Sequence, residues 1–279
     1  MERRSLAALA VLGICGMPVA IAGTAGRFSG IDNGWRVFFG GLHQDYREYN
    51  SGLNAALAAP IIDRERGVIP EMSLVLRRAD ARLYGDLTLR LGAGRDTYRG
   101  SACGANTCVP AASNTSNQIL QTMFRLGPTL DGLRMRVVPF LALGTTTWYR
   151  TIESTPSASG TSERYAFAYY GGGVLIQRVF GSTLVWSLDA LAARTIHPVL
   201  NVTNSEGALT MALGARPFWR VHTGLELAVG GGWWLASGVA YTRFAFGASP
   251  IYVTSQRPVQ EPASRTEQWS LNLGFGRRF

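Results

Sequence analysis

Several alternating segments carry charged residues at positions of the same parity, which places them on one face of predicted β-strands. In the segment around residue 88, Asp86 and Arg90 alternate with Leu87, Leu89 and Leu91, and a strand sends successive side chains to opposite faces. The charged residues with this parity are Asp86, Arg90, Arg136, Asp189 and Glu226. Charges removed from water need partners of opposite sign, so these residues predict an interior salt-bridge network. Filling of the interior is favoured over a transport path.

The three histidines, His43, His197 and His222, are the next candidates for chemistry. Nucleophilic hydrolysis needs a histidine beside a hydroxyl or a carboxylate. His197 lies at the end of a predicted strand, and Ser205 or Asp63 would have to be its partner. A solitary histidine at a strand end is more often a polar surface residue, so we assign no catalytic residue.

The cysteines predict a small covalent loop. Cys15 falls in a predicted leader, and Cys103 and Cys108 have four residues between them. In an oxidising compartment such a pair predicts a disulfide. A metal site would need further ligands, and no histidine or third cysteine stands near the pair. We predict neither a metal nor a cofactor.

The basic charge is carried by arginine. The formal net charge is +9, and all 27 basic residues are Arg. They are spread through strand-like segments and interleaved with Trp, Tyr and Gly, which disfavours nucleic acid as a partner. Because guanidinium groups suit phosphate, the pattern favours phosphates on a membrane surface.

The segment 266–279 shows the clearest alternation among the elements that must hold these charges. Its large apolar residues share one parity and are Trp269, Leu271, Leu273, Phe275 and Phe279. No later residue follows in the sequence to cover this face, and about ten alternating residues can cross a bilayer as a tilted strand. The segment therefore predicts a lipid-facing barrel strand.

Nine further alternating segments precede it, so the chain predicts ten strands. The predicted ranges are 35–49, 71–78, 83–98, 118–126, 133–149, 164–180, 184–197, 209–229, 234–246 and 266–279. Long polar connections alternate with short turns, as in a transmembrane antiparallel up-and-down β-barrel. Pro217 is a point where 209–229 could bend, and eight or twelve strands are the alternative counts. A soluble β-sandwich is the alternative fold.

The beginning of the chain has the pattern of a secretory signal peptide, predicted for residues 1–22. Arg3 and Arg4 precede an apolar run, and small residues follow at cleavage spacing near Ala22. The barrel domain would then span 23–279. The sequence contains no apolar run of 18 residues or more, which is the pattern that would predict a membrane helix.

The last strand, ending at Phe279, resembles the closing strand of bacterial outer-membrane β-barrels, although Arg277 departs from that pattern. The resemblance implies an assembly signal in Trp269, Leu271, Leu273, Phe275 and Phe279, read by the barrel assembly machinery. It also implies a monomer in the outer membrane of a Gram-negative bacterium. The long loops would be extracellular, both termini periplasmic, and the surrounding lipid would include lipopolysaccharide.

The count of ten also resembles the omptins, which are surface proteases, but the resemblance covers the architecture alone. Their site needs an Asp-x-His pair, and Thr195 stands where the Asp before His197 would have to be. We therefore predict a surface-exposed barrel acting non-enzymatically through its long loops, in binding, adhesion or envelope integrity. The alternatives are a small-solute channel and a rim hydrolase of omptin or lipid A-modifying type.

Overall fold

The computed structural model describes residues 28, 31–49, 52–56, 62–103, 107–156, 158–205, 207–254 and 258–279. The predicted signal peptide, 1–22, and the predicted start of the mature chain at residue 23 lie outside these ranges. In the described ranges, no helix has the length and apolar character needed to cross a bilayer.

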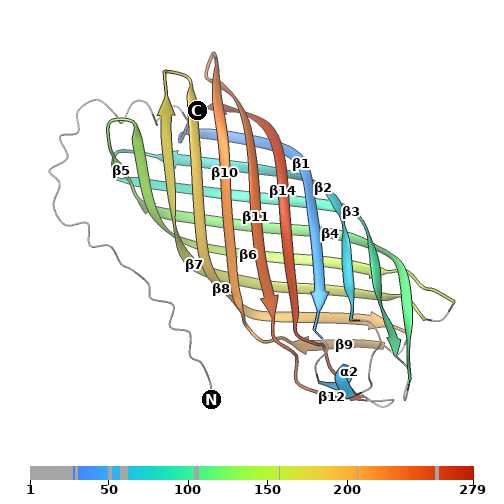
Figure 1. The fold of residues 1–279 in the computed structure, drawn as a ribbon. Coiled ribbons are helices and arrows are strands. Elements are labelled where there is room, and N and C mark those ends of the chain that lie inside the picture. Colours follow the sequence, from blue (N-terminus) through green and yellow to red (C-terminus); the bar gives the residue numbers. More distant parts are fainter. Residues whose placement is uncertain are drawn as a thin grey trace, which may run out of the picture.

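Ten long antiparallel strands close into a barrel within the described residues (Figure 1). They are β1 (Gly34–Glu48), β2 (Arg64–Ala79), β3 (Leu83–Cys103), β4 (Cys108–Pro128), β6 (Met135–Ile152), β7 (Thr161–Phe180), β8 (Leu184–Asn204), β10 (Pro217–Gly230), β11 (Trp233–Phe246) and β14 (Ser264–Arg278). Each neighbours the next in sequence order, β14 pairs with β1, and β10 pairs with both β8 and β11. The predicted all-β, antiparallel up-and-down barrel of ten strands is confirmed.

Short elements lie at the two ends of the barrel. β5 (Leu130–Asp131) pairs with β6, and β9 (Gly207–Ala212) extends the sheet beside β8. β12 (Tyr252–Val253) pairs with β13 (Pro258–Val259), and α2 (Leu53–Ala56) is a single helical turn. Figure 1 shows the C-terminus and β5 at one end, which we call the terminal end, and β9, β12 and α2 at the other, which we call the loop end.

The predicted strand 209–229 is divided in the structure. β9 ends at Ala212 and β10 begins at Pro217. Proline has no backbone N–H to donate to a ladder and is tolerated as the first residue of a strand. The bend considered for Pro217 is therefore a break between two strands.

Several predicted loops at the loop end are strands. β3 and β4 pair residue by residue from Leu83 and Pro128 out to Cys103 and Cys108, and β8 continues to Asn204. The predicted loop of residues 99–116 is mostly a long hairpin, and 201–207 is largely strand. These extensions carry small and polar residues on both faces, so hydrophobic alternation does not reveal them.

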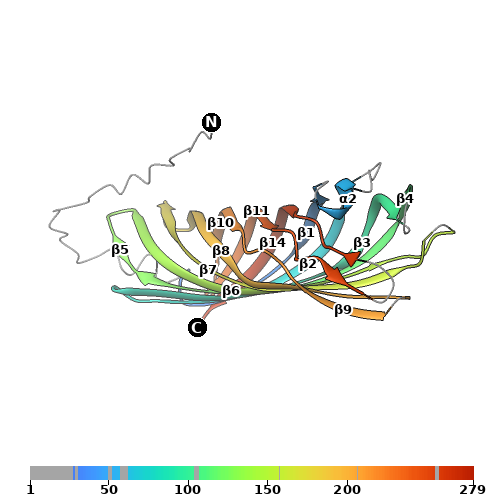
Figure 2. The ribbon, with the colours of Figure 1, turned by 90° about the horizontal axis from the view of Figure 1, so that it is seen from below.

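The wall has an apolar outside and a polar and aromatic inside. Outward residues such as Leu141, Leu271 and Leu273 are exposed, whereas the alternate residues are buried. This arrangement is the reverse of that in a water-soluble protein, and a bilayer requires it because the outer face contacts lipid. The short turns at the terminal end use left-handed glycines, Gly181 (φ 63°) and Gly230 to Gly232 (φ 60° to 98°). Figure 2 shows the curvature of the strands, and the pairing of β10 with β8 closes the sheet.

Candidate functional site

All five charged residues predicted to face the interior are buried there: Asp86, Arg90, Arg136, Asp189 and Glu226. Their exposed fractions run from 1% for Arg136 to 6% for Arg90. None of them pairs directly with another of the five among the ion pairs of the described residues. Apart from His222, which pairs with Asp189, their ion-pair partners are side chains that the sequence analysis did not name.

Glu226 of β10 forms ion pairs across the lumen with residues of two other strands. Its carboxylate binds Arg36 of β1 and Arg77 of β2, each at 2.6 Å. Both arginines are buried at inward positions of their strands. Arg36 was missed because the glycines at 40 and 41 made the parity of its strand ambiguous in the sequence.

Arg125 of β4 links the two predicted aspartates. Its Nη2 lies 2.5 Å from Asp86, and its Nη1 lies 3.3 Å from Asp189. Tyr84 donates a hydrogen bond of 2.6 Å to Asp86, and His222 Nδ1 lies 2.9 Å from the other oxygen of Asp189. His222 and Asp189 are directly opposite each other on β10 and β8.

Arg90 is held by polar side chains of β14. It donates hydrogen bonds to Gln268 (3.1 Å) and Ser270 (3.2 Å), and Glu71 lies 3.5 Å away.

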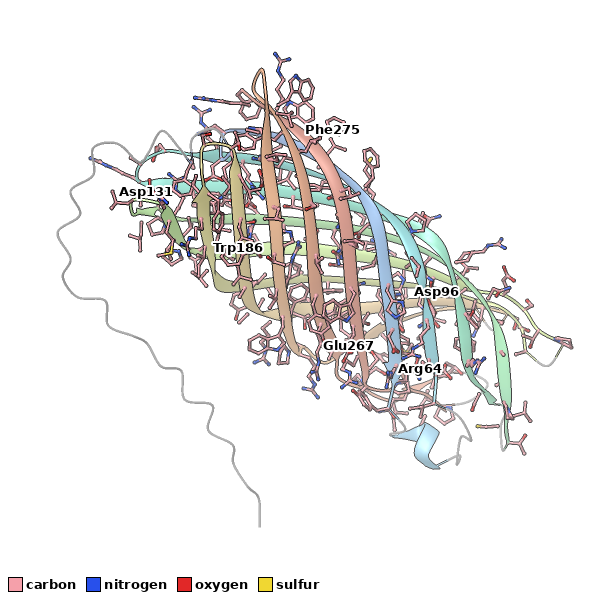
Figure 3. All side chains as sticks on the ribbon, turned by 45° about the horizontal axis from the view of Figure 1, so that its top comes forward. Arg64, Asp96, Asp131, Trp186, Glu267 and Phe275 are labelled. Atoms are coloured by element: carbon pink, nitrogen blue, oxygen red, sulfur yellow. The ribbon has the colours of Figure 1, made fainter. Side chains whose placement is uncertain are left out.

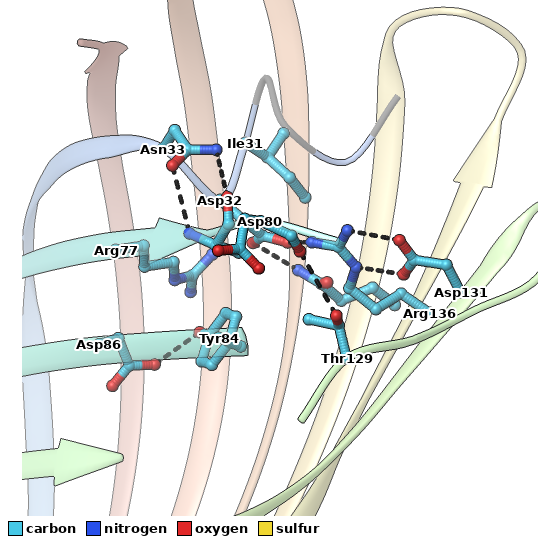
Figure 4. A network of polar contacts seen from close by, with 12 residues as sticks. Ile31, Asp32, Asn33, Arg77, Asp80, Tyr84, Asp86, Thr129, Asp131 and Arg136 are labelled. Atoms are coloured by element: carbon cyan, nitrogen blue, oxygen red, sulfur yellow. Dashed lines mark hydrogen bonds and ion pairs between the residues drawn. The ribbon is translucent and has the colours of Figure 1, made fainter. Parts of the chain in front are cut away.

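Arg136 anchors residues of the N-terminal segment inside the terminal end. It binds Asp131 at 2.6 Å and Asp32 at 2.8 Å, and its guanidinium lies 4.9 Å from the ring of Phe28. Gln177 donates to the other oxygen of Asp32 at 2.8 Å. Figure 4 shows Arg136 between Asp32 and Asp131.

Phe28, Ile31 and Asp32 form a plug, the name used here for these three residues. All three are inaccessible to solvent. The two apolar side chains pack in one cluster with Val179, Val185 and Trp234 from the surrounding wall. The plug therefore packs against the inside of the wall at the terminal end of the lumen.

An aromatic layer crosses the lumen closer to the loop end. Tyr169 stacks on Phe218 with ring centroids 4.2 Å apart. Tyr165 stacks between Trp148 (5.2 Å) and Phe246 (5.7 Å). These rings belong to β6, β7, β10 and β11, so they join opposite sides of the wall. Hydrophobic alternation did not identify them, because they share the polar parity.

A cluster of carboxylates, the mouth cluster, lies above the aromatic layer and consists of Glu48, Glu65, Asp63, Glu163 and Glu261 with Arg150. Arg150 binds Glu65 and Glu163, each at 3.0 Å. Glu261 comes from the connection between β11 and β14 and accepts a hydrogen bond of 2.8 Å from Tyr165. The sequence analysis did not identify this cluster, because its members come from five separate segments.

Burial raises the pKa of two carboxyl groups of the mouth cluster that lie in segments connecting the strands. Burial raises the pKa of Glu261 to about 8, and the nearby Glu163 adds to this effect. Burial also raises the pKa of Asp63, although Tyr98 donates a hydrogen bond of 2.6 Å to it. At neutral pH the Glu261 carboxyl group is therefore mostly protonated.

The described residues do not assemble a hydrolase site around His197. His43 and His197 are exposed on the outside of the wall, and His222 lies inside. The considered partner Asp63 is bound instead by Tyr98 and the backbone of Ser101. In the described residues, no group of three or more His, Cys, Asp or Glu side chains is arranged to hold a metal ion.

Cys103 and Cys108 stand directly opposite each other at the tip of the β3–β4 hairpin. Opposite residues of antiparallel strands have Cα atoms about 4.5 to 5.5 Å apart, a separation that a disulfide can span. The disulfide stays a prediction.

The residues of the predicted assembly signal lie on the outer face of β14: Trp269, Leu271, Leu273 and Phe275, followed by Phe279 at the chain end. Figure 3 shows Phe275 toward the terminal end, and Glu267 and Arg64 toward the loop end.

No protein-family model and no curated protein matches the chain. Among solved structures, the chain is similar to the outer membrane protease OmpT from Escherichia coli, with a TM-score of 0.60 at 8% identity, covering 89% of this chain and 97% of OmpT. Looser matches include OprG from Pseudomonas aeruginosa (TM-score 0.37, 8% identity, 89% and 97% covered). Another is Ail from Yersinia pestis (TM-score 0.32, 9% identity, 88% and 99% covered).

The chain has the fold of a bacterial outer-membrane β-barrel. At 8% identity the likeness to OmpT concerns the fold, and the predicted resemblance to omptin architecture without the omptin motif is confirmed.

Proposed function

We propose that this protein is an integral outer-membrane β-barrel that acts non-enzymatically at the cell surface through its loop end, with a lumen closed to solutes. The observation that carries the proposal is the filled interior. The plug, the buried charge pairs, the aromatic layer and the mouth cluster follow one another along the barrel. If solutes cannot pass through the lumen, the part of the barrel that can contact partners outside the cell is its loop end.

Two aromatic clusters on the outside support placement in a membrane. Trp35, Trp233 and Phe275 lie within 6.3 Å of one another at the terminal end, and Tyr241 lies 4.8 Å from Trp269 nearer the loop end. Aromatic girdles mark the two interfaces of outer-membrane barrels. In this orientation both termini and the short turns are periplasmic, and the loop end is extracellular.

A group of arginines lies just beyond the aromatic pair Tyr241 and Trp269, toward the loop end. This group supports lipopolysaccharide as the lipid partner. Arg47, Arg64 and Arg66 surround the carboxylate of Asp45, each within 2.8 Å, and their side chains are 36% to 53% exposed. Three cations around one anion leave charge for a phosphate, which arginine binds well. Replacing Arg64 and Arg66 by Gln should weaken binding of purified lipopolysaccharide, whereas Arg178→Gln at the terminal end should not. Equal binding by both variants would contradict this partner.

The remaining parts of the proposal concern biogenesis. The protein is secreted with residues 1–22 as its signal, assembled by the barrel assembly machinery, and stays a monomer with a Cys103–Cys108 disulfide. Unboiled protein in detergent should migrate differently from boiled protein on a denaturing gel, because the closed barrel resists unfolding. Recovery in the soluble periplasmic fraction would refute the membrane assignment.

A rim hydrolase is the second candidate, because the mouth cluster places Glu261, whose pKa burial raises to about 8, beside Glu163 and Glu48. Such neighbours can serve as acid and base. The test is hydrolysis of a peptide or of a lipid A ester by purified protein. Activity lost in Glu261→Gln and retained in Glu267→Gln would replace the non-enzymatic proposal.

A further inference from the structure

Arginines from opposite sides of the barrel line one cavity of about 60 Å³ in the lumen. Arg77, Arg90 and Arg125 approach from β2, β3 and β4, and Arg220 with His222 from β10. The sole acidic residue lining the cavity in the described part of the chain is Asp189. The cavity lies between the plug and the aromatic layer.

The arginines differ in how they are neutralised. Arg77 pairs with Glu226, Arg125 with Asp86 and Asp189, and Arg90 with Glu71 at the longer distance of 3.5 Å. No ion pair joins Arg220 to a carboxylate within the described residues, and Asp189 is already shared by Arg125 and His222. The cavity therefore has an excess of positive charge.

The hydrogen-bond donors of the same residues point to the same deficit. Nε of Arg77, Nε of Arg90 and Nε of Arg220 are buried without a hydrogen-bond acceptor, and Nη1 of Arg125 has only its ion pair with Asp189 at 3.3 Å. Three of these side chains are more than nine-tenths buried. A buried donor without an acceptor costs free energy, so the arginines lining this cavity have fewer acceptors than donors among the described residues.

We propose that this cavity binds a small inorganic anion of halide size, held by Arg90 and Arg220 with His222 beside it. An anion supplies the missing acceptor and also neutralises Arg220, whereas water supplies the acceptor alone. The volume suits one such ion, because a water molecule needs about 10 to 15 Å³ by the same measure. Since the lumen is closed, the ion enters while the barrel folds and remains as a structural component.

Bromide tests the site directly, because its anomalous scattering distinguishes it from water. Crystals of the full barrel, refolded and grown in sodium bromide, should show an anomalous peak in the cavity beside the guanidinium groups of Arg90 and Arg220. Bromide confined to exposed arginines, with water alone in the cavity, would overturn the proposal.

Thermal unfolding provides a second test in detergent. Protein refolded in sodium chloride should unfold at a higher temperature than protein refolded in sodium gluconate at equal ionic strength, because gluconate is too large for the cavity. Arg220→Gln should abolish the difference, and Arg243→Gln, an exposed outward arginine on β11, should retain it. An equal chloride effect in both variants would reject the site. If Arg220→Gln fails to fold, the bromide peak in the wild-type protein decides.

Discussion

Glu226 is the residue whose loss should affect the interior most, because two buried arginines depend on it. Glu226→Gln keeps the size of the side chain and leaves Arg36 and Arg77 sharing a neutral amide. Removing one partner of a buried ion pair costs about 3 to 5 kcal/mol, so we expect a loss of that order in the free energy of unfolding. Urea unfolding of the barrel in detergent would measure it.

The matched control is Glu267→Gln, because Glu267 pairs with Arg265 at 3.2 Å in a partly exposed position. A surface pair contributes about 0 to 1 kcal/mol. Equal effects of the two substitutions would show that the interior network does not stabilise the barrel.

At the residue scale, parity in the sequence located inward side chains but not their partners. Asp189 and His222 lie on strands separated by a break at Pro217, and their pairing depends on the register between β8 and β10. The partners of Glu226 come from strands far away in the sequence. Alternation within one strand predicts neither the register between two strands nor which distant strands supply the ion-pair partners.

At the scale of elements, β14 completes the barrel by pairing with both β1 and β11. Phe279 follows it and contributes one backbone hydrogen bond, to Asn33, at 3.2 Å. We expect deletion of Phe279 to slow assembly in cells while the finished barrel keeps its stability. The measurement is the growth with time of the heat-modifiable form. Phe180→Ala, an exposed outward change at the same end, should assemble at the wild-type rate, and equal slowing would argue against an assembly signal.

The β3–β4 hairpin should tolerate loss of its predicted disulfide. A bridge across four residues closes a short loop, so it should contribute about 2 kcal/mol or less. Replacing Cys103 and Cys108 by Ser should leave the heat-modifiable barrel unchanged. Reaction of both cysteines with a thiol reagent in wild-type cells would show that the bridge does not form.

The segment carrying Glu261 should release from the mouth as pH rises. A free glutamate titrates near 4.5, and the buried Glu261 has a pKa of about 8. Between these values the released segment loses its proton and the bound one keeps it, so the stability of the bound state falls as pH increases. Amide exchange at Ser249 and Glu261, which are hydrogen-bonded to each other, would report the release.

Glu261→Gln is the control for this pH effect, because glutamine stays neutral. Its segment should lose less protection than the wild-type segment across the range from pH 5 to 9. The same loss of protection in wild type and variant would assign the effect to other groups.

The elements within the apolar band could be predicted from the sequence, and those beyond it could not. In the band the bilayer demands one apolar face, which makes β6 and β14 visible as alternation. The arms of β3 and β4 near the cysteines face water on the outside, so their residues are free to be polar on both sides. Their pairing follows from continuation of the hairpin register.

At the scale of the whole molecule, the barrel is filled along its length by charged side chains in some parts and aromatic side chains in others. Charge pairs occupy the terminal half, and the aromatic layer and the ion pairs of Arg150 in the mouth cluster occupy the loop half. Ten strands enclose little more than side chains can fill, whereas porins with open channels use about 16 to 18. The strand count therefore indicated a narrow lumen, while the plug lay in a segment that no strand pattern covers.

The central claim is that the lumen is closed, and single-channel recording in planar bilayers tests it most directly. The purified wild-type protein should insert without stable conductance steps of porin size, because the plug, the ion pairs and the aromatic layer fill the path in series. Reproducible open steps of porin size from the wild-type protein would contradict the account and favour a solute channel.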